Sequence, residues 1–295
     1  MDDESDSADL FAWAPTWRAR GAALGKVLAF LAAGLVVTLL ASVPVMFVHI
    51  KASRSPSLID TLMLEAPVAV GIVLANGLMW LIWREPLARF GLGAAGRRGL
   101  HLGIGLAAGL GFFSALMLLL WALGLARFAG PSGASEALAN GLVSVVLFAG
   151  VAIVEEGLFR GYGFVQLAGA VSFWPAAIVG SAIFTATHLT NAGETPFGLL
   201  HVAVFGLVAA YSVRRTGGIW FALGYHAAWD FTESFVWGAP DSGAVLPGAL
   251  IHTVLRGPAM LSGGAAGPEG SVFSLVTELA LLATAWALGR RKRAG

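Results

Sequence analysis

Residues 27–50 read VLAFLAAGLVVTLLASVPVMFVHI and contain no Asp, Glu, Lys or Arg. A bilayer core of ~30 Å is crossed by about twenty apolar residues in an α-helix. The apolar core of a cleaved signal peptide is shorter, at about 7–15 residues. The stretch therefore predicts a helix that spans the membrane and is retained in the mature protein.

Similar apolar runs recur along the chain and predict an all-α polytopic integral membrane protein with about eight transmembrane helices. The predicted spans are 27–50, 61–83, 102–126, 141–168, 172–190, 196–213, 218–237 and 271–289. The whole chain is 57% hydrophobic and only 12% charged, whereas about a quarter of the residues in a soluble domain are charged. This composition excludes a typical water-soluble enzyme.

The predicted organisation is one membrane domain, because no polar block is long enough to fold separately. It covers 27–289, with its polar motifs between 140 and 237, and is flanked by cytoplasmic tails at 1–26 and 290–295. The net charge of +1 gives no basic bias toward nucleic acid. Since the chain has no cysteine, disulfides, thiolate metal sites and a cysteine nucleophile are excluded.

Lys and Arg residues between the spans predict the orientation, because cytoplasmic loops carry an excess of them. With the N-terminus in the cytoplasm, only four of the 18 lie outside, namely Lys51, Arg54, Arg127 and Arg256. The other 14 lie on the cytoplasmic side, so we expect both termini there. The Ala-, Gly- and Arg-rich composition is typical of a bacterial protein, which places it in the inner membrane.

Ionisable residues within predicted spans need an explanation, because each costs roughly 2.5–3.5 kcal/mol to insert. Three groups stand out. Glu155, Glu156 and Arg160 lie in VEEGLFRGYGF, Phe184 and His188 in SAIFTATHL, and His226 and Asp230 in GYHAAWDF. Residues four apart share a helix face. We therefore expect an ion pair between Glu156 and Arg160, with Glu155 on an adjacent face, and His226 beside Asp230.

Helix geometry indicates that these groups meet. If the fourth and fifth spans form a hairpin with its apex near 170–172, Glu155 and His188 lie ~24 and ~26 Å from that apex. His226 lies only ~12 Å beyond the turn at 217–218. The three groups then meet if the hairpin protrudes about 10 Å into the cytoplasm, and the site is expected to open on that side.

A carboxylate beside two imidazoles is suited to the activation of water. The carboxylate takes a proton from the water, while neutral imidazoles hold a divalent metal such as zinc or hydrogen-bond the water and the developing oxyanion. This chemistry predicts hydrolysis of an amide bond inside the membrane.

The three groups resemble the motifs of the CPBP family of intramembrane proteases, which includes the CAAX prenyl endopeptidases. The family pattern is EExxxR, then FxxxH, then HxxxN or HxxxD, and all three occur here in that order over about 140–237. The resemblance implies an endopeptidase that cleaves a membrane-associated protein or peptide.

The resemblance also implies roles for the site residues. Glu155 would be the general base, Glu156 and Arg160 would support it, and His188 would position the water or metal. His226 and Asp230 would complete the site as ligands or oxyanion stabilisers. A metal, expected to be zinc, would be held by His188, His226 and Glu155, and a metal-free glutamate-dependent hydrolase is the alternative. Specificity for prenylated C-termini is not carried over to a bacterial chain.

Two other functional classes are compatible with the same residues. The first is a non-catalytic membrane scaffold or immunity protein of the same fold, and the second is a proton- or ion-coupled transporter that uses Glu155 and the histidines as a relay. The GPSG at 130–133 matches the serine motif of rhomboid proteases, but turn residues there are ordinary. No HExxH sequence occurs.

The remaining polar and small residues are expected to be structural. Glu65, His201 and Glu278 lie within predicted spans but outside any motif. The third span contains four glycines, at 103, 105, 109 and 111, that suit close helix packing. The Gly- and Pro-rich segment 239–270 is expected to be an external loop that partly re-enters the membrane or lies on its surface.

Overall fold

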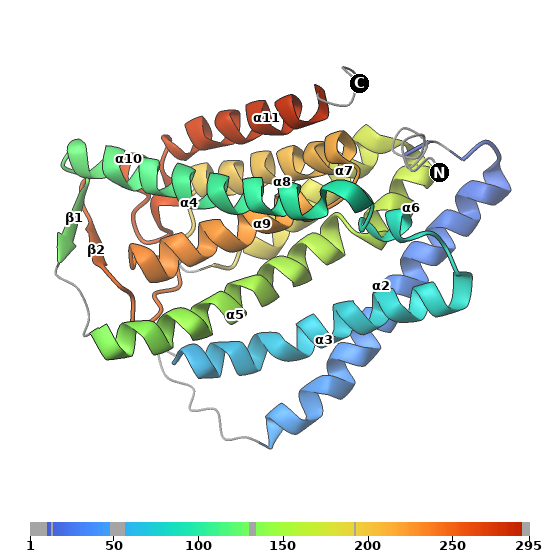
Figure 1. The fold of residues 1–295 in the computed structure, drawn as a ribbon, viewed down its shortest axis with the longest axis horizontal. Coiled ribbons are helices and arrows are strands. Elements are labelled where there is room, and N and C mark those ends of the chain that lie inside the picture. Colours follow the sequence, from blue (N-terminus) through green and yellow to red (C-terminus); the bar gives the residue numbers. More distant parts are fainter. Residues whose placement is uncertain (1–10, 13, 48–56, 130–133, 192, 291–295) are drawn as a thin grey trace.

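The computed structural model describes residues 11–12, 14–47, 57–129, 134–191 and 193–290, and its elements are labelled in Figure 1. The main helices are α2 (Trp17–Met46), α3 (Leu58–Trp83), α4 (Arg98–Ala122), α5 (Ala134–Phe159), α6 (Tyr162–Val171), α7 (Phe173–His188), α8 (Pro196–Thr216), α9 (Trp220–Asp230) and α11 (Ser274–Arg290). Helix α9 continues as a π-helix, η3 (Phe231–Val236). The GPSG segment lies outside the described residues.

Five apolar helices of the described chain are long enough to cross a membrane: α2, α3, α4, the α5–α6 segment over Ala137–Val171, and α8. The prediction of a polytopic helical membrane protein is therefore confirmed. The fifth, seventh and eighth predicted spans correspond to shorter helices, since α7 has 16 residues, α9 and η3 have 11 and 6, and α11 has 17. The count of eight spans stays a prediction.

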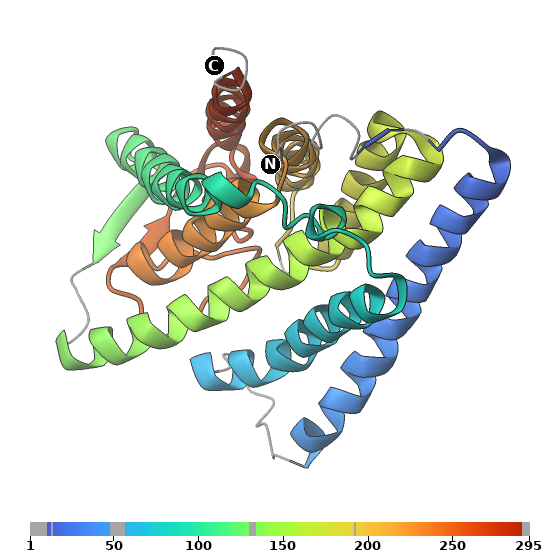
Figure 2. The same cartoon turned by 45° about the vertical axis from the view of Figure 1, so that its right-hand side comes forward.

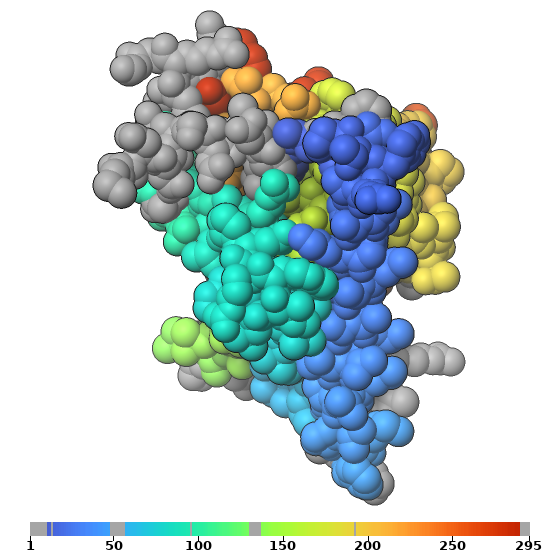
Figure 3. Space-filling view, turned by 90° about the vertical axis from the view of Figure 1, so that its right-hand side faces the viewer, coloured from blue at the N-terminus to red at the C-terminus, as the bar shows by residue number. Residues whose placement is uncertain are grey.

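The molecule has two distinct ends (Figure 1). We call one the basic end, formed by the start of α2, the end of α11 and the connections 84–97 and 214–219. Figure 3 views this end, where the start of α2 and the α3–α4 connection lie at the surface. We call the other the sheet end, formed by 57–61, 126–129, 189–195 and 238–273. The long helices α3, α4 and α8 each begin at one end and finish at the other (Figure 1).

The sheet end shows how the loop predicted at residues 239–270 is built. Strand β2 (His252–Leu255) pairs antiparallel with β1 (Ala126–Ala129), and the short helices α10 (Ala259–Ser262) and η4 (Pro268–Gly270) follow. The predicted third span, 102–126, accordingly ends four residues early, at Ala122. Each strand has only four residues, and the pairing joins distant parts of the chain, so no local sequence pattern reveals it.

Helix α5 runs between the α2–α3 pair and the group formed by α4, α9 and α11 (Figure 2). It ends at Phe159, and α6 begins at Tyr162, so the predicted continuous span 141–168 is divided. Gly161 occupies the break, where an added Cβ would collide with the carbonyl oxygen of Gly157. The hairpin apex predicted at 170–172 is confirmed, since Ser172 separates α6 from α7 with a φ of 74°.

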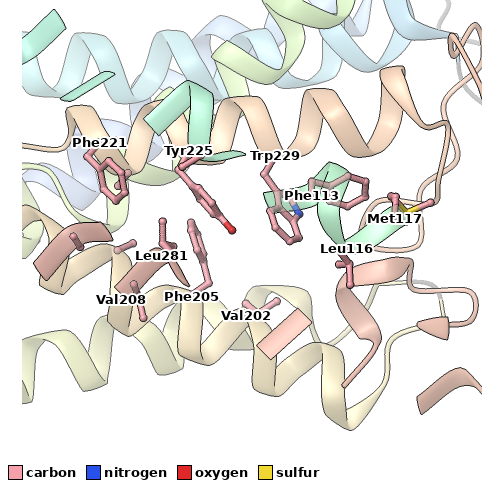
Figure 4. Close-up of a cluster of buried hydrophobic side chains, with 14 of the residues drawn as sticks. Phe113, Leu116, Met117, Val202, Phe205, Val208, Phe221, Tyr225, Trp229 and Leu281 are labelled. Carbon is pink, nitrogen blue, oxygen red and sulfur yellow. The ribbon is translucent and has the colours of Figure 1, made fainter. Parts of the chain in front are cut away.

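The largest hydrophobic core lies between α4, α8, α9 and α11 (Figure 4) and includes Phe113, Phe205, Tyr225, Trp229 and Leu281. Helix α4 packs along α9 at two glycines, because a Cβ at Gly105 or Gly109 would meet the α9 backbone. At the other two predicted glycines, 103 and 111, an added Cβ meets open space. Close packing is thus confirmed for half of the predicted stripe.

Candidate active site

Glu156 and Arg160 form a buried ion pair near the end of α5. Arg160 Nη1 donates to Glu156 Oε1 over 3.0 Å, and the two residues are 1% and 0% exposed. The guanidinium carbon of Arg160 also lies 4.5 Å from the ring centre of Phe184 and 5.4 Å from that of Phe205. The predicted pair is therefore present, and aromatic faces support its cation.

Glu156 also positions His226. Its Oε1 lies 2.9 Å from His226 Nδ1, and because a carboxylate only accepts, Nδ1 donates in this bond. The other ring nitrogen, Nε2, lies 3.5 Å from both Glu155 Oε2 and Asp230 Oδ2. The pair Glu156–Arg160 thus fixes one edge of the imidazole, and the opposite edge faces two further carboxylates.

The two adjacent glutamates have different surroundings. The Glu156 side chain is fully buried behind the site, whereas that of Glu155 is 26% exposed and lines a cavity of about 350 Å³. This confirms that the two side chains point to different faces of α5. Glu155 is the carboxylate that a water molecule or substrate can reach.

His188 reaches the same cavity from the last residue of α7. Its Nδ1 donates to the carbonyl oxygen of Phe184 over 2.9 Å, and its ring packs edge-on against the Phe184 ring at 4.8 Å. Phe184 therefore contacts both Arg160 and His188. This explains the FxxxH spacing, since one aromatic side chain supports a residue of each neighbouring motif.

The cavity brings together residues from all three motifs, with Glu156 and Arg160 behind its wall. Its ionisable lining residues are Glu65, Glu155, His188, His201, His226, Asp230, Asp241 and Glu269. His201 stacks on Trp229, and its Nδ1 lies 3.6 Å from Glu278 Oε1. Asp241 and Glu269 come from the segment 238–273, and no motif or helical spacing points to them.

The cavity faces the sheet end of the molecule. Its lining includes the first two turns of α3, the end of α7 and parts of 238–273, but nothing from the connections 84–97, 160–172 or 214–219. We expected both termini and the opening on one side of the membrane. The structure contradicts that combination, because the start of α2 and the end of α11 lie at the basic end (Figure 1).

Donor atoms around His226 fit a divalent metal in their chemistry, and two single pairs of them have the spacing of metal ligands. Two ligands of a tetrahedral zinc ion lie about 3.4 Å apart when each bond is about 2.1 Å, and Nε2 is 3.5 Å from each of two carboxylate oxygens. Glu156, bonded to Nδ1, would orient the ligand from behind. Beyond these single pairs the spacing is too wide, because neither Glu155, His188 and His226 nor Glu155, His226 and Asp230 bring all their donor atoms within 4.8 Å of one another.

Comparison with known proteins supports the motif assignment. A model of the type II CAAX prenyl endopeptidase Rce1-like family matches residues 137–232, which run from α5 to the first residues of η3 and contain all three motifs. Neither the curated proteins nor the solved structures give a match. The family implies a protease with a peptide or protein substrate in the membrane. The match confirms the resemblance to the CPBP/CAAX protease family, which rests on residues 137–232 of this chain.

Proposed function

We propose that the protein is an intramembrane endopeptidase in which Glu155 activates the attacking water. The observation that carries this proposal is the arrangement around His226. Its Nδ1 is held 2.9 Å from Glu156, and its Nε2 faces Glu155 and Asp230 at 3.5 Å each. A scaffold has no need for an imidazole fixed on one edge and directed toward two carboxylates in an open cavity.

In the proposed reaction, Glu155 accepts a proton from water as the water oxygen attacks the scissile carbonyl carbon. The C–N bond of the resulting tetrahedral intermediate then breaks, and the proton on Glu155 passes to the leaving amine. His226 and His188 both use Nδ1–H in bonds to fixed acceptors. When neutral, each ring therefore directs an Nε2 lone pair toward the cavity, where it can accept a hydrogen bond from water.

The same tautomer suits a metal ligand, and we propose a divalent metal, zinc, as the cofactor. His226, His188 and Glu155 are the proposed ligands, with Asp230 near His226 as a further donor, and their donor atoms would have to draw closer together around a bound ion. When bound, such a metal would polarise the substrate carbonyl and lower the pKa of a bound water. The test is metal analysis of the purified wild type beside His188→Ala/His226→Ala. Near-stoichiometric zinc lost in the variant is expected, and a metal-free wild type never exposed to chelator would overturn this assignment.

The main test of the proposed hydrolase is Glu155→Gln. It keeps the shape of the side chain but removes its basicity, so cleavage should fall about 10²–10⁴-fold. The matched control is Glu278→Gln, a buried glutamate that does not line the cavity. Mass spectrometry of new N-termini in membranes that express each protein measures the outcome. Equal cleavage by wild type and Glu155→Gln would contradict the proposal and leave the scaffold or transporter.

We further propose an inner-membrane orientation with the basic end in the cytoplasm, which directs the cavity to the opposite side. The positive-inside distribution supports it. The natural chain has no cysteine, so single cysteines report accessibility without background. Val245→Cys, at an exposed sheet-end position, should react with an impermeant maleimide on intact cells. Gly96→Cys, in the α3–α4 connection, should react only after permeabilisation. The reverse pattern would place the cavity toward the cytoplasm.

A further inference from the structure

A second group of carboxylates lies at the sheet end, beside the motif residues. Glu233 comes from η3, Asp241 from the segment after it, and Glu269 from η4. One oxygen of each lies within 4.8 Å of the others. Glu233 is 0% and Glu269 7% exposed, and Asp241 is partly buried. Three segments separated in sequence thus converge on one small volume.

No Lys or Arg of the described residues compensates the charge of this group. The Lys and Arg ion pairs of the described residues join Lys26 to Glu85 and Arg160 to Glu156, and none includes these three acids. Burial raises the pKa of Asp241 to about 6. Burial and the neighbouring Asp241 raise the pKa of Glu269 to about 8. Charges that lose water must be neutralised by protons or by a bound cation.

Glu233 provides an independent observation that favours a bound cation. Its Oε2 accepts from Trp229 Nε1 over 2.9 Å, but its Oε1 is buried and has no hydrogen-bond partner among the described residues. Oε1 faces Gly267, two residues before Glu269, where an added Cβ would lie 3.0 Å away and would also collide with the carbonyl oxygen of Pro240. Gly267 has a φ of +124°, so this position favours glycine. The backbone of Gly267 therefore packs directly beside an unsatisfied carboxylate oxygen.

We propose that Glu233, Asp241 and Glu269 bind a hard divalent cation of the calcium class. All donors are oxygens, which Ca²⁺ prefers and gathers in sets of six to eight from flexible segments. Ser242 donates from its N and Oγ to Glu269 Oε1, at 2.8 and 2.9 Å, and Ser234 Oγ donates to Asp241 Oδ2 at 2.9 Å. These bonds orient the carboxylates and still leave one oxygen free on each of Asp241 and Glu269. The absence of nitrogen and sulfur donors argues against zinc here.

The proposed cation would also stabilise one wall of the cavity. Asp241 and Glu269 line it together with Asp230, which precedes Glu233 by less than one helical turn. A bound cation would tie η3 to the segment 238–273 and hold that wall in place. If the cavity wall moves without the cation, peptide cleavage should fall. That expectation rests on the proposed function, whereas cation binding itself does not.

Terbium luminescence provides a test that is independent of activity. Tb³⁺ replaces Ca²⁺ at oxygen sites, and Trp229, bonded to Glu233, can sensitise it. The probe is added to full-length, chelator-stripped protein in detergent. We expect saturable emission that Ca²⁺ displaces and that Glu233→Gln/Glu269→Gln weakens at least tenfold in affinity. Asp241→Asn serves as a milder second variant if the double variant fails to fold. Emission that all three substitutions leave unchanged, or no saturable emission, would overturn the proposal.

Glu155→Gln is the matched control for this experiment. It removes a carboxylate from the same cavity but not from the proposed cation site. Terbium binding should be unchanged in it. If the wild type binds terbium as expected but shows no cleavage, the cation site is supported and the proposed protease function is refuted. If Glu155→Gln abolishes terbium binding instead, the probe occupies the motif site and the second site is refuted.

Discussion

Glu156 and Glu233 are both fully buried carboxylates, yet their surroundings differ. Glu156 accepts from Arg160 at 3.0 Å and from His226 at 2.9 Å, so its charge has a cation and a second donor. Glu233 accepts from the neutral indole of Trp229 and lies beside two other acids, with its Oε1 unpartnered. One group contains its own counter-charge and the other does not. The charge of Glu156 is therefore neutralised within the fold, whereas the group of Glu233 needs protons or a bound cation.

The largest expected effect comes from removing the internal counter-charge. Arg160→Met leaves the buried Glu156 with His226 as its remaining partner and without its permanent counter-charge, which should lower the free energy of unfolding by about 3 kcal/mol. Adding Glu156→Gln to Arg160→Met should recover part of that loss. Arg256→Met, which removes an exposed arginine, is the control and should change stability by less than about 0.5 kcal/mol. Denaturant unfolding in detergent measures all four proteins, and equal stability of Arg160→Met and wild type would contradict the comparison.

The second prediction concerns Glu156 as a positioning residue. Glu156→Gln keeps an oxygen that can accept from His226 Nδ1 but loses the charge that favours this orientation. Cleavage should fall about 10–100-fold, as for other groups that orient a catalytic or metal-bound histidine. The pH profile of cleavage should also shift, whereas a purely structural role would lower the rate at every pH alike. Glu278→Gln is again the control.

The contacts within the three motifs were largely predictable from the sequence, because they join residues at helical spacing. Glu156 and Arg160 are four residues apart, as are Phe184 and His188, and His226 and Asp230, and each pair shares a face. The contact of Glu156 with His226, from another helix, was not predicted. It depends on the register of α5 against α9, which hydropathy does not report.

The carboxylate group and the cavity direction were not predictable by the same reasoning. Glu233, Asp241 and Glu269 are joined through a Gly- and Pro-rich segment whose strand pairs with residues 126–129. A pairing across that many residues has no local signal. Hydropathy also averages over about 19 residues, so it cannot detect the two-residue break at 160–161 or the π-helical turn of η3.

The third prediction reverses the sign of the first. Without a divalent cation and above about pH 8, where Glu269 is ionised, Glu269→Gln removes one charge from a group of like charges, so it should stabilise the chelated protein by about 1 kcal/mol. With saturating Ca²⁺ the same substitution should destabilise relative to wild type, because a ligand is lost. Thermal unfolding of wild type and Glu269→Gln, with chelator and with Ca²⁺, measures the two changes in stability. A loss of stability in chelator comparable to that of Arg160→Met would mean that Glu269 has a counter-charge of its own.

The last prediction concerns the pH dependence of the chelated protein, which follows from the carboxyl groups of Asp241 and Glu269. In the folded state its pKa is raised by burial from 3.8 to about 6, and that of Glu269 from 4.5 to about 8. The folded protein therefore binds more protons than the unfolded chain between about pH 4 and 8, and its stability should fall as pH rises through this window. Ca²⁺ competes with these protons, so its stabilising effect should grow over the same range. Melting temperatures at pH 5, 6.5 and 8, with chelator or Ca²⁺, measure both trends. A chelated protein that becomes more stable from pH 5 to 8 would indicate that the group is neutralised within the fold, as Glu156 is by Arg160.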